Sequence, residues 1–196
     1  MFFKLVSLSG FIASIWIVAG VAIAGYLYGG YSHTRQLCSE LGAAGSPTEK
    51  ISPVINNYPL GILFCIFGWF LIKNNVSLHV VVVGWLVVLH GVGTLIAGYF
   101  PMDADPYTKK PTRECEFHTL AGLLMLVTLV LAPVIMLFGD MSPNFKLFTV
   151  ICLLLFLAFM VKMVQEYKNR GRIGLYQRLS YGAQLLWLGG FSLVAS

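Results

Sequence analysis

Long apolar runs alternate with short polar connectors along the whole chain. The apolar runs cover residues of about 5–28, 55–72, 77–99, 118–138, 147–166 and 174–195. Each run is close to the roughly 20 residues that an α-helix needs to cross the hydrocarbon core of a bilayer. A membrane β-barrel would instead show short segments in which apolar and polar residues alternate. The pattern predicts an all-α fold, a polytopic membrane protein whose residues 1–196 form one bundle of six transmembrane helices.

The composition points to the same class of protein. Of the 196 residues, 58% are hydrophobic and 11% are charged, whereas about 25% of the residues in an ordinary soluble domain are charged. The two longest connectors, residues 29–54 and 100–117, have no hydrophobic pattern that would form a separate core. The first apolar run is longer than the apolar region of a signal peptide, so we expect it to be retained as a helix.

The basic residues indicate an orientation. Ten of the 13 Lys and Arg residues lie in or beside the connectors after the first, third and fifth predicted helices, and three lie on the opposite side. The positive-inside rule places those connectors in the cytoplasm and both termini outside, in a multi-pass protein of the cell membrane. The basic run 168–172 has no interleaved aromatic residues, so we expect it to meet anionic headgroups. Membrane lipids, and not nucleic acid, are the expected partners, and the pattern leaves the oligomeric state open.

The four cysteines divide into two pairs. Cys65 and Cys152 fall inside predicted helices, where a thiol is most often a small apolar packing group. Cys38 and Cys115 fall in the two long connectors, on the same predicted side. A disulfide between them requires an oxidising compartment, and the charge pattern argues against that compartment.

His90 is a polar residue within the third predicted helix. It shares a helical stripe with Gly93, Thr94 and Ala97. Small residues favour close packing of helices, so His90 should point into the bundle. Two interpretations remain open: a binding residue, or a neutral histidine that forms a structural hydrogen bond with a neighbour.

Asp103 and His118 lie where the third and fourth predicted helices meet their connector. Pro101 prevents the third helix from continuing with normal hydrogen bonds, which fixes Asp103 near its end. A carboxylate beside a histidine sets the tautomer of the ring and raises its basicity. The two residues are therefore a candidate functional pair at the membrane boundary, and the alternative is a solvated loop.

Arg178 lies about one turn inside the last predicted helix. An arginine at that depth either reaches the headgroups or pairs with an acid inside the bundle. Small residues on its helical face favour the inward position, with Asp103 or Glu40 as the predicted partner. Ser39 and Glu40 belong to a short interfacial helix that we expect near residues 34–41.

Five motifs, in this order, resemble the integral-membrane family catalogued as domain-of-unknown-function family 998. They are SELGAAGSP at 39–47, NNYPLG at 56–61, GYFPMD at 98–103, FHTLAG at 117–122 and GLYQRLSYGAQLLW at 174–187. The resemblance implies a compact bundle of about six helices, with a polar set at Ser39, Glu40, Asp103, His118 and Arg178. It implies no established reaction. A distant similarity to the six-helix group that contains autophagy-modulator proteins and lipid-anchor remodelling factors favours lipid handling.

The main hypothesis is a lipid-handling protein with a polar site near one membrane face, which binds a headgroup or catalyses hydrolysis or acyl transfer. Arg178 would contact a phosphate or carboxylate, with Glu40 and His90 as further binding residues. His118 would act as general base, Asp103 would orient it, and Ser39 would be the nucleophile. No GxSxG motif surrounds Ser39, and the sequence leaves open whether the protein is an enzyme.

Three other classes of function remain as alternatives. A noncatalytic scaffold or partner subunit agrees with every pattern above. A haem or quinone redox protein would use His90 and His118, although the depths of these two residues differ by about 10 Å at 1.5 Å per residue. A zinc enzyme would use the same histidines and Asp103, but no HExxH motif is present, so no metal site is predicted and the cofactor is unknown.

Overall fold

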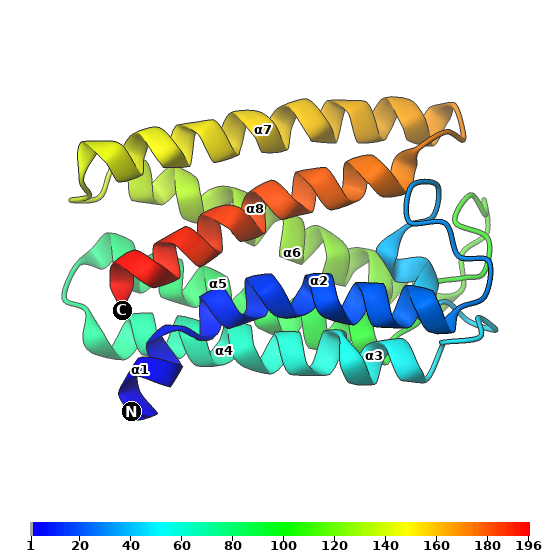
Figure 1. Cartoon of the computed structure of the whole chain (residues 1–196), viewed down its shortest axis with the longest axis horizontal. Helices are drawn as coiled ribbons and strands as arrows, with labels where there is room; N and C mark the ends of the chain where they lie inside the picture. The colour runs from blue at the N-terminus through cyan, green and yellow to red at the C-terminus, as the bar shows by residue number, and fades with distance from the viewer. Residues whose placement is uncertain (1) are drawn as a thin grey trace.

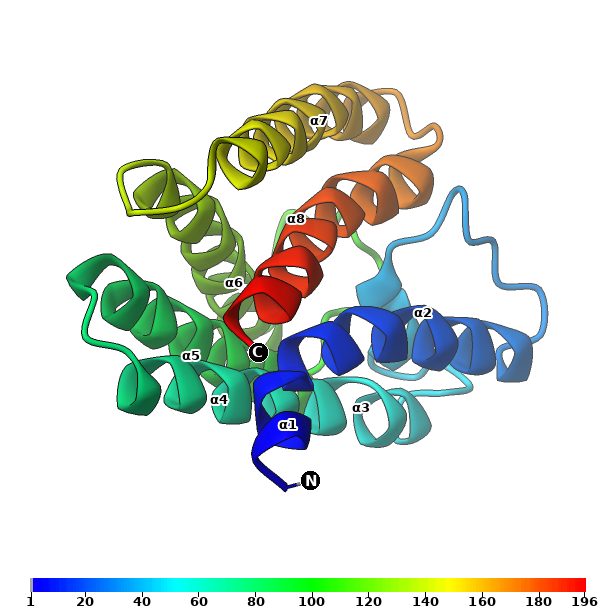
Figure 2. The ribbon, with the colours of Figure 1, turned by 60° about the vertical axis from the view of Figure 1, so that its left-hand side comes forward.

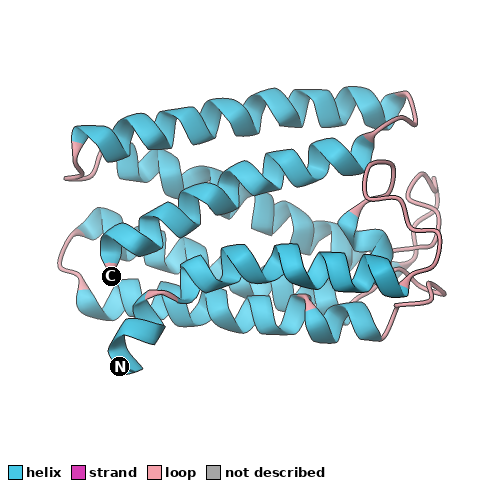
Figure 3. Cartoon of the chain, in the orientation of Figure 1, coloured by secondary structure: helices cyan, strands magenta, loops and turns pink. Residues whose placement is uncertain are grey.

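The long helices run side by side as one bundle (Figure 1, Figure 3). A computed structural model describes residues 2–196, and no β-strand occurs within that range. The helices are α1 (Phe2–Ser7), α2 (Ser9–Leu27), the 3₁₀ helix η1 (Cys38–Gly42), α3 (Ile51–Ile55), α4 (Asn57–Asn74), α5 (Leu78–Tyr99), α6 (Arg113–Leu137), α7 (Pro143–Lys168) and α8 (Ile173–Ala195). The predicted all-α fold is confirmed.

Five segments are long and apolar enough to cross a membrane. They are Ser9–Leu27, Ile51–Asn74, Leu78–Tyr99, Arg113–Leu137 and Pro143–Lys168, the second of which combines α3 and α4. The sixth long helix, α8, is less apolar because it lies against α2, α6 and α7 and buries polar side chains among them (Figure 2). The chain is therefore a helical membrane protein, and its long helices follow the six predicted apolar runs.

Glycines bring α4 and α5 into close backbone contact. A Cβ atom added to Gly68 would lie 2.5 Å from the Gly84 carbonyl oxygen, and one added to Gly91 would lie 2.7 Å from the Gly61 carbonyl oxygen. Only residues without a side chain allow this approach. Helices inside lipid have no hydrophobic driving force for association, so the van der Waals contacts of such close packing hold them together. The two helices form the tightest hairpin of the bundle.

Helix α6 begins five residues before the predicted apolar run. The Thr112 hydroxyl accepts a hydrogen bond from the Cys115 N–H at 3.2 Å, which satisfies one of the free N–H groups of the first turn. The first turn also carries Glu114 and Glu116, and negative charge there is favourable because it faces the positive end of the helix dipole. Capping therefore extends the helix beyond the part that hydropathy detects.

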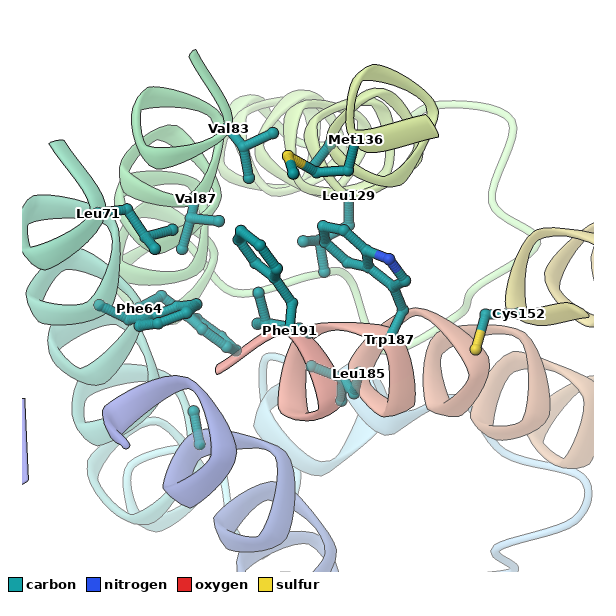
Figure 4. Close-up of a cluster of buried hydrophobic side chains, with 14 of the residues drawn as sticks. Phe64, Leu71, Val83, Val87, Leu129, Met136, Cys152, Leu185, Trp187 and Phe191 are labelled. Carbon is teal, nitrogen blue, oxygen red and sulfur yellow. The ribbon is translucent and has the colours of Figure 1, made fainter. Parts of the chain in front are cut away.

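The apolar core lies at the end of the bundle that holds both chain termini (Figure 1, Figure 4). Large buried side chains come from α4, α5, α6 and α8, and include Phe64, Leu71, Val87, Met136, Trp187 and Phe191. The Trp187 and Phe191 rings stack with their centroids 5.3 Å apart. This end of the bundle is closely packed around these side chains.

The opposite end of the bundle holds both long connectors. The Ala44 N–H donates to the Met102 carbonyl oxygen at 2.9 Å, which joins the two connectors to each other. The Leu175 N–H donates to the Thr34 carbonyl oxygen at 2.9 Å, so the first connector also lies against the start of α8. These two hydrogen bonds confirm the prediction that the two long connectors lie at the same end of the bundle.

Helices α2 and α8 touch near the core end and separate toward the connectors (Figure 1, Figure 2). The Ser14 hydroxyl donates to the Leu185 carbonyl oxygen at 2.9 Å at their point of contact. Toward the connector end, the first connector fills part of the space between them. The bundle is thus closed at one end and open between two helices at the other.

Candidate functional site

A cavity of about 1060 Å³ extends from the connector end of the bundle along α2 and α8 toward the end that holds the termini. It is lined by α2, α4, α5, α6, α7 and α8 and by residues of the first connector. Most of the lining is apolar, and the polar side chains are concentrated toward the connector end. One polar end and one apolar body are features of a site for an amphiphilic molecule.

Arg178 supplies the charge at the polar end. Its guanidinium donates to the carbonyl oxygens of Gln36 and Gly174, each at 2.9 Å, and to the Tyr31 hydroxyl. The Tyr31 ring also faces the guanidinium, with the Arg178 Cζ 5.6 Å from the ring centroid. Gly174 permits this arrangement, because a Cβ atom there would lie 2.1 Å from the Gln36 oxygen.

The predicted ion pair of Arg178 with Asp103 or Glu40 is wrong. The two Glu40 oxygens accept from the Leu37 N–H at 2.7 Å and from the Gln36 amide at 3.1 Å, so this carboxylate caps η1. All the acceptors that hold Arg178 are neutral. Arg178 therefore keeps its positive charge without a carboxylate partner in the described part of the chain.

The surroundings of Arg178 favour neutral forms of the other titratable groups. Burial raises the pKa of Tyr31 well above its ordinary value, and Arg178 offsets this only in part. Burial and then the charge of Arg178 lower the pKa of His33. Burial also raises the pKa of Cys38. Arg178 is consequently the fixed charge of the site.

The lining residues give the cavity a positive electrostatic character. Among residues 2–196, its lining contains no Asp or Glu side chain, and Arg178 is its only Arg or Lys. An unpaired guanidinium that is partly removed from water is costly unless an anion accompanies it. The cavity is therefore suited to an anionic group.

His118 lies in the lining of the cavity, at the start of α6. Its Nδ1 lies 2.8 Å from the Phe100 carbonyl oxygen and 3.0 Å from the Ala97 carbonyl oxygen. Carbonyl oxygens only accept, so Nδ1 carries a proton, and Nε2 has no hydrogen-bond partner among the described residues. Backbone carbonyls at the end of α5, and not a carboxylate, orient this histidine.

Asp103 makes its contacts away from His118. Its oxygens accept from the Thr112 hydroxyl at 2.7 Å and from the Thr112 N–H at 2.9 Å. These two hydrogen bonds lower the pKa of the Asp103 carboxyl. Asp103 fixes the residue that caps α6, so the predicted pairing of Asp103 with His118 is absent from the structure.

Ser39 and Cys38 line the polar end from η1. The Cys38 N–H donates to the Gln177 side-chain oxygen at 2.7 Å, which fixes η1 on α8. In the described range the Ser39 hydroxyl has no hydrogen bond with a histidine or a carboxylate. All four cysteines are free thiols, so Cys38 and Cys115 form no disulfide here.

His90 is buried outside the cavity lining and joins three helices. Its Nδ1 lies 3.0 Å from the Met125 carbonyl oxygen and its Nε2 lies 3.0 Å from the Tyr181 hydroxyl. The carbonyl requires a proton on Nδ1, so Nε2 accepts from the tyrosine. Both ring nitrogens are occupied by α6 and α8. This geometry matches the structural interpretation of His90 and gives no support to a haem ligand at this position.

Three buried polar atoms that lack hydrogen-bond partners belong to residues of the cavity lining. They are Oδ1 of Asn56, Nε of Arg178 and Nε2 of Gln184. Buried polar groups are nearly always paired, so each exception calls for a specific explanation. All three atoms have almost no accessible surface, so they lie behind the cavity wall and do not face the cavity itself.

Several lining residues were missed in the sequence. Gln184 lies mid-helix in an apolar stretch, and its polarity at that depth was the signal that could have identified it. Asn57 lies within the NNYPLG motif, and its amide donates to the Thr94 carbonyl oxygen at 3.3 Å. His33 lines the cavity from the first connector, where no periodic pattern predicts its position, and the same holds for Tyr31, which contacts Arg178 outside the lining.

The family resemblance extends over almost the whole bundle. The model of a family described as "Protein of unknown function (DUF998)" matches residues 11–194, from the first turn of α2 to the last turn of α8. No curated protein and no solved structure shows significant similarity to the chain. The matched range contains all five motifs and the complete lining of the cavity. The chain therefore belongs to the DUF998 family of proteins of unknown function.

Proposed function

We propose that the protein binds an anionic membrane lipid, with the headgroup at Arg178 and the hydrocarbon in the apolar body of the cavity. The observation that carries this proposal is the guanidinium held by neutral acceptors in a cavity whose described lining has no acid. A phosphate or carboxylate on the ligand would supply the missing negative charge. Charge-assisted hydrogen bonds to such a group are about twice as strong as neutral ones.

A lipid fits the cavity better than a water-soluble anion. The lining beyond the polar end consists mainly of aliphatic, aromatic and methionine side chains of α2, α6, α7 and α8, with Ser14 and Gln184 among them. Some of these residues lie on the outer surface of the bundle: Val18 is 70% exposed and Leu186 is 56% exposed. In a membrane that surface meets acyl chains, so the cavity communicates sideways with the bilayer.

Lipid binding is favoured over hydrolysis or acyl transfer. A hydrolase of the serine type needs a nucleophile, a base and a group that orients the base. His118 has a free Nε2, but Asp103 is bound to Thr112, and the Cys38 thiol has a raised pKa. The catalytic roles of Ser39, His118 and Asp103 stay predictions. Headgroup recognition requires none of them.

We further propose that the protein resides in the cell membrane, with the connector end in the cytoplasm and both termini outside. The distribution of basic residues, ten against three, supports this orientation. The site would then open at the cytoplasmic leaflet, which carries the anionic lipids that attract basic segments. Membrane lipids are the proposed partners.

The direct test compares lipid binding by the parent and by Arg178→Gln in neutral nanodiscs that contain a small fraction of dioleoyl phosphatidylglycerol. Glutamine removes the charge and keeps a hydrogen-bonding group. Loss of a charge-assisted hydrogen bond of about 1.5–3 kcal/mol predicts binding weaker by about 10- to 150-fold. Native mass spectrometry of the released protein counts the bound anionic lipids.

Arg172→Gln is the matched control, because Arg172 is an exposed arginine in the turn before α8 and lies outside the cavity lining. It should retain the phosphatidylglycerol of the parent. Equal binding by the Arg178→Gln variant and the parent would contradict the proposal.

A further inference from the structure

The lining residues of α8 form one continuous stripe. Arg178, Gly182, Leu186, Gly189 and Leu193 follow one another at spacings of four, four, three and four residues, and all five line the cavity. Such spacings place side chains on one face of a helix. The stripe begins at the charged end of the cavity and continues to the apolar end near the C-terminus.

A second stripe faces it from α2. Phe11, Ile15, Val18 and Ala22 recur at spacings of four, three and four residues and line the same cavity. The two stripes define what we call the α2–α8 groove. Its sides meet where Ser14 contacts α8, and they separate toward the connectors (Figure 1).

The two stripes are long enough to follow a lipid chain. The 15-residue separation of Arg178 and Leu193 corresponds to about 22 Å along the helix axis, at 1.5 Å per residue. The open part of the groove, from Arg178 to the contact of Ser14 with Leu185, spans seven residues, or about 10 Å. A chain whose head is held at Arg178 would therefore lie between the helices over this part and continue in the leaflet, whose hydrocarbon is about 15 Å thick.

Glycines leave part of this groove empty. A Cβ atom added to Gly182 would meet no atom within 4 Å, although this residue lies between the charged and the apolar parts of the stripe. The same holds for Gly122, which lines the cavity from α6. Helix glycines usually permit close helix packing, but Gly182 and Gly122 are both exposed, and a Cβ atom at either position would touch no neighbouring helix. Space beside Gly182 is therefore available to a ligand.

We infer that the α2–α8 groove is an acyl-chain subsite that takes the chain of an anionic lipid sideways from the leaflet at the connector end. This inference rests on the proposed function and assigns the place of the hydrocarbon: one acyl chain lies between α2 and α8 and enters from the side. The charge at Arg178 selects the head, and the exposed side chains Val18 and Leu186 form the lateral entrance.

The test introduces a larger side chain into the groove and measures lipid binding. Gly182→Leu places a side chain in empty space, so we expect the variant to fold and melt like the parent. It should displace about two methylene groups of a bound chain, which weakens retention of dioleoyl phosphatidylglycerol about tenfold. Gly29→Leu is the control, since a Cβ atom there also meets nothing within 4 Å, but Gly29 lies outside the cavity lining.

A second measurement uses only the parent protein. Binding of phosphatidylglycerols with chains of 8, 12 and 18 carbons should tighten with chain length, and glycerol 3-phosphate at millimolar concentration should compete poorly. Parent-like retention of dioleoyl phosphatidylglycerol by Gly182→Leu, or equal affinity across the chain series, would overturn the acyl-chain subsite. Either result would leave headgroup binding intact if Arg178→Gln still loses the lipid, so the two proposals fail separately.

Discussion

At the scale of single residues, backbone carbonyls take the positions that the sequence suggested for carboxylates. Arg178 is held by the carbonyls of Gln36 and Gly174, and His118 is oriented by those of Ala97 and Phe100. A carbonyl neutralises no charge, so the arginine stays available to an anionic ligand. The same carbonyls place a proton on Nδ1 of His118.

The sequence located the inward-facing residues but not their partners. The small residues beside His90 and Arg178 correctly predicted side chains directed into the bundle. Helix order places a residue at one membrane face, but it does not say which helix lies next to it. The sequence cannot identify a backbone carbonyl as a hydrogen-bond partner, because every residue has a backbone carbonyl. The Asp103–His118 and Arg178–acid pairs were wrong for this reason.

Tyr181→Phe tests the hydrogen bond that joins α5 to α8. Removal of the hydroxyl leaves Nε2 of His90 buried without a donor, which typically costs about 1–3 kcal/mol. We expect a lower midpoint of thermal unfolding in detergent. Tyr26→Phe, at a side chain that is 88% exposed, should melt like the parent. Identical midpoints for both variants would show that the His90–Tyr181 contact does not stabilise the bundle.

At the scale of helices, hydropathy predicted which segments are helical and capping decided where they begin. The first turn of α6 is polar and depends on Thr112, so hydropathy placed its start too late. Glycine spacing marked α5 as a close-packing helix, but it did not identify which helix would meet each glycine. The structure divides them: Gly84 and Gly91 face α4, whereas Gly93 faces α6. One helix can therefore pack closely on two sides.

Alanine substitutions at two helix glycines compare a glycine that is closely packed against another helix with one that has open space beside it. Gly91→Ala would place a methyl group 2.6 Å from the Cys65 sulfur and 2.7 Å from the Gly61 oxygen. Overpacking of this kind costs about 1–3 kcal/mol, so the unfolding midpoint should fall. Gly122→Ala meets no atom within 4 Å and should be neutral or stabilising, since alanine is the better helix former. The prediction fails if Gly122→Ala is the more destabilised variant.

At the scale of the whole molecule, the bundle has one charged end and one apolar end. The two long connectors and the turn 169–172 carry most of the basic residues, and they lie at the end where the cavity is polar. The number of apolar runs was enough to predict this grouping. Each crossing takes the chain to the other side of the membrane, so the connectors after the first, third and fifth helices share one side. The cavity itself was beyond the sequence, since it depends on the angle at which α2 and α8 diverge.

Labelling of a cysteine at Asn169 tests the orientation of the molecule. In a variant whose four native cysteines are replaced by serine, Asn169→Cys lies in the turn between α7 and α8. A membrane-impermeant maleimide should label it only after the cells are opened, because the positive-inside rule places this turn in the cytoplasm. A cysteine that replaces Ser196 should react in intact cells. The reverse result would invert the proposed topology.

The position of the cavity beside the core has a mechanical consequence. Side chains at the core end are held by neighbours on every side, whereas those around the cavity lack contacts across about 1060 Å³ of space. Local opening therefore requires less free energy at the connector end than at the end with the termini. A ligand that fills the space binds only the closed, folded state and stabilises it. The free energy of this stabilisation increases with the logarithm of the ligand concentration. Under the proposed function, the rigidity of this part of the bundle would depend on the surrounding bilayer and would change with the lipids that the membrane contains.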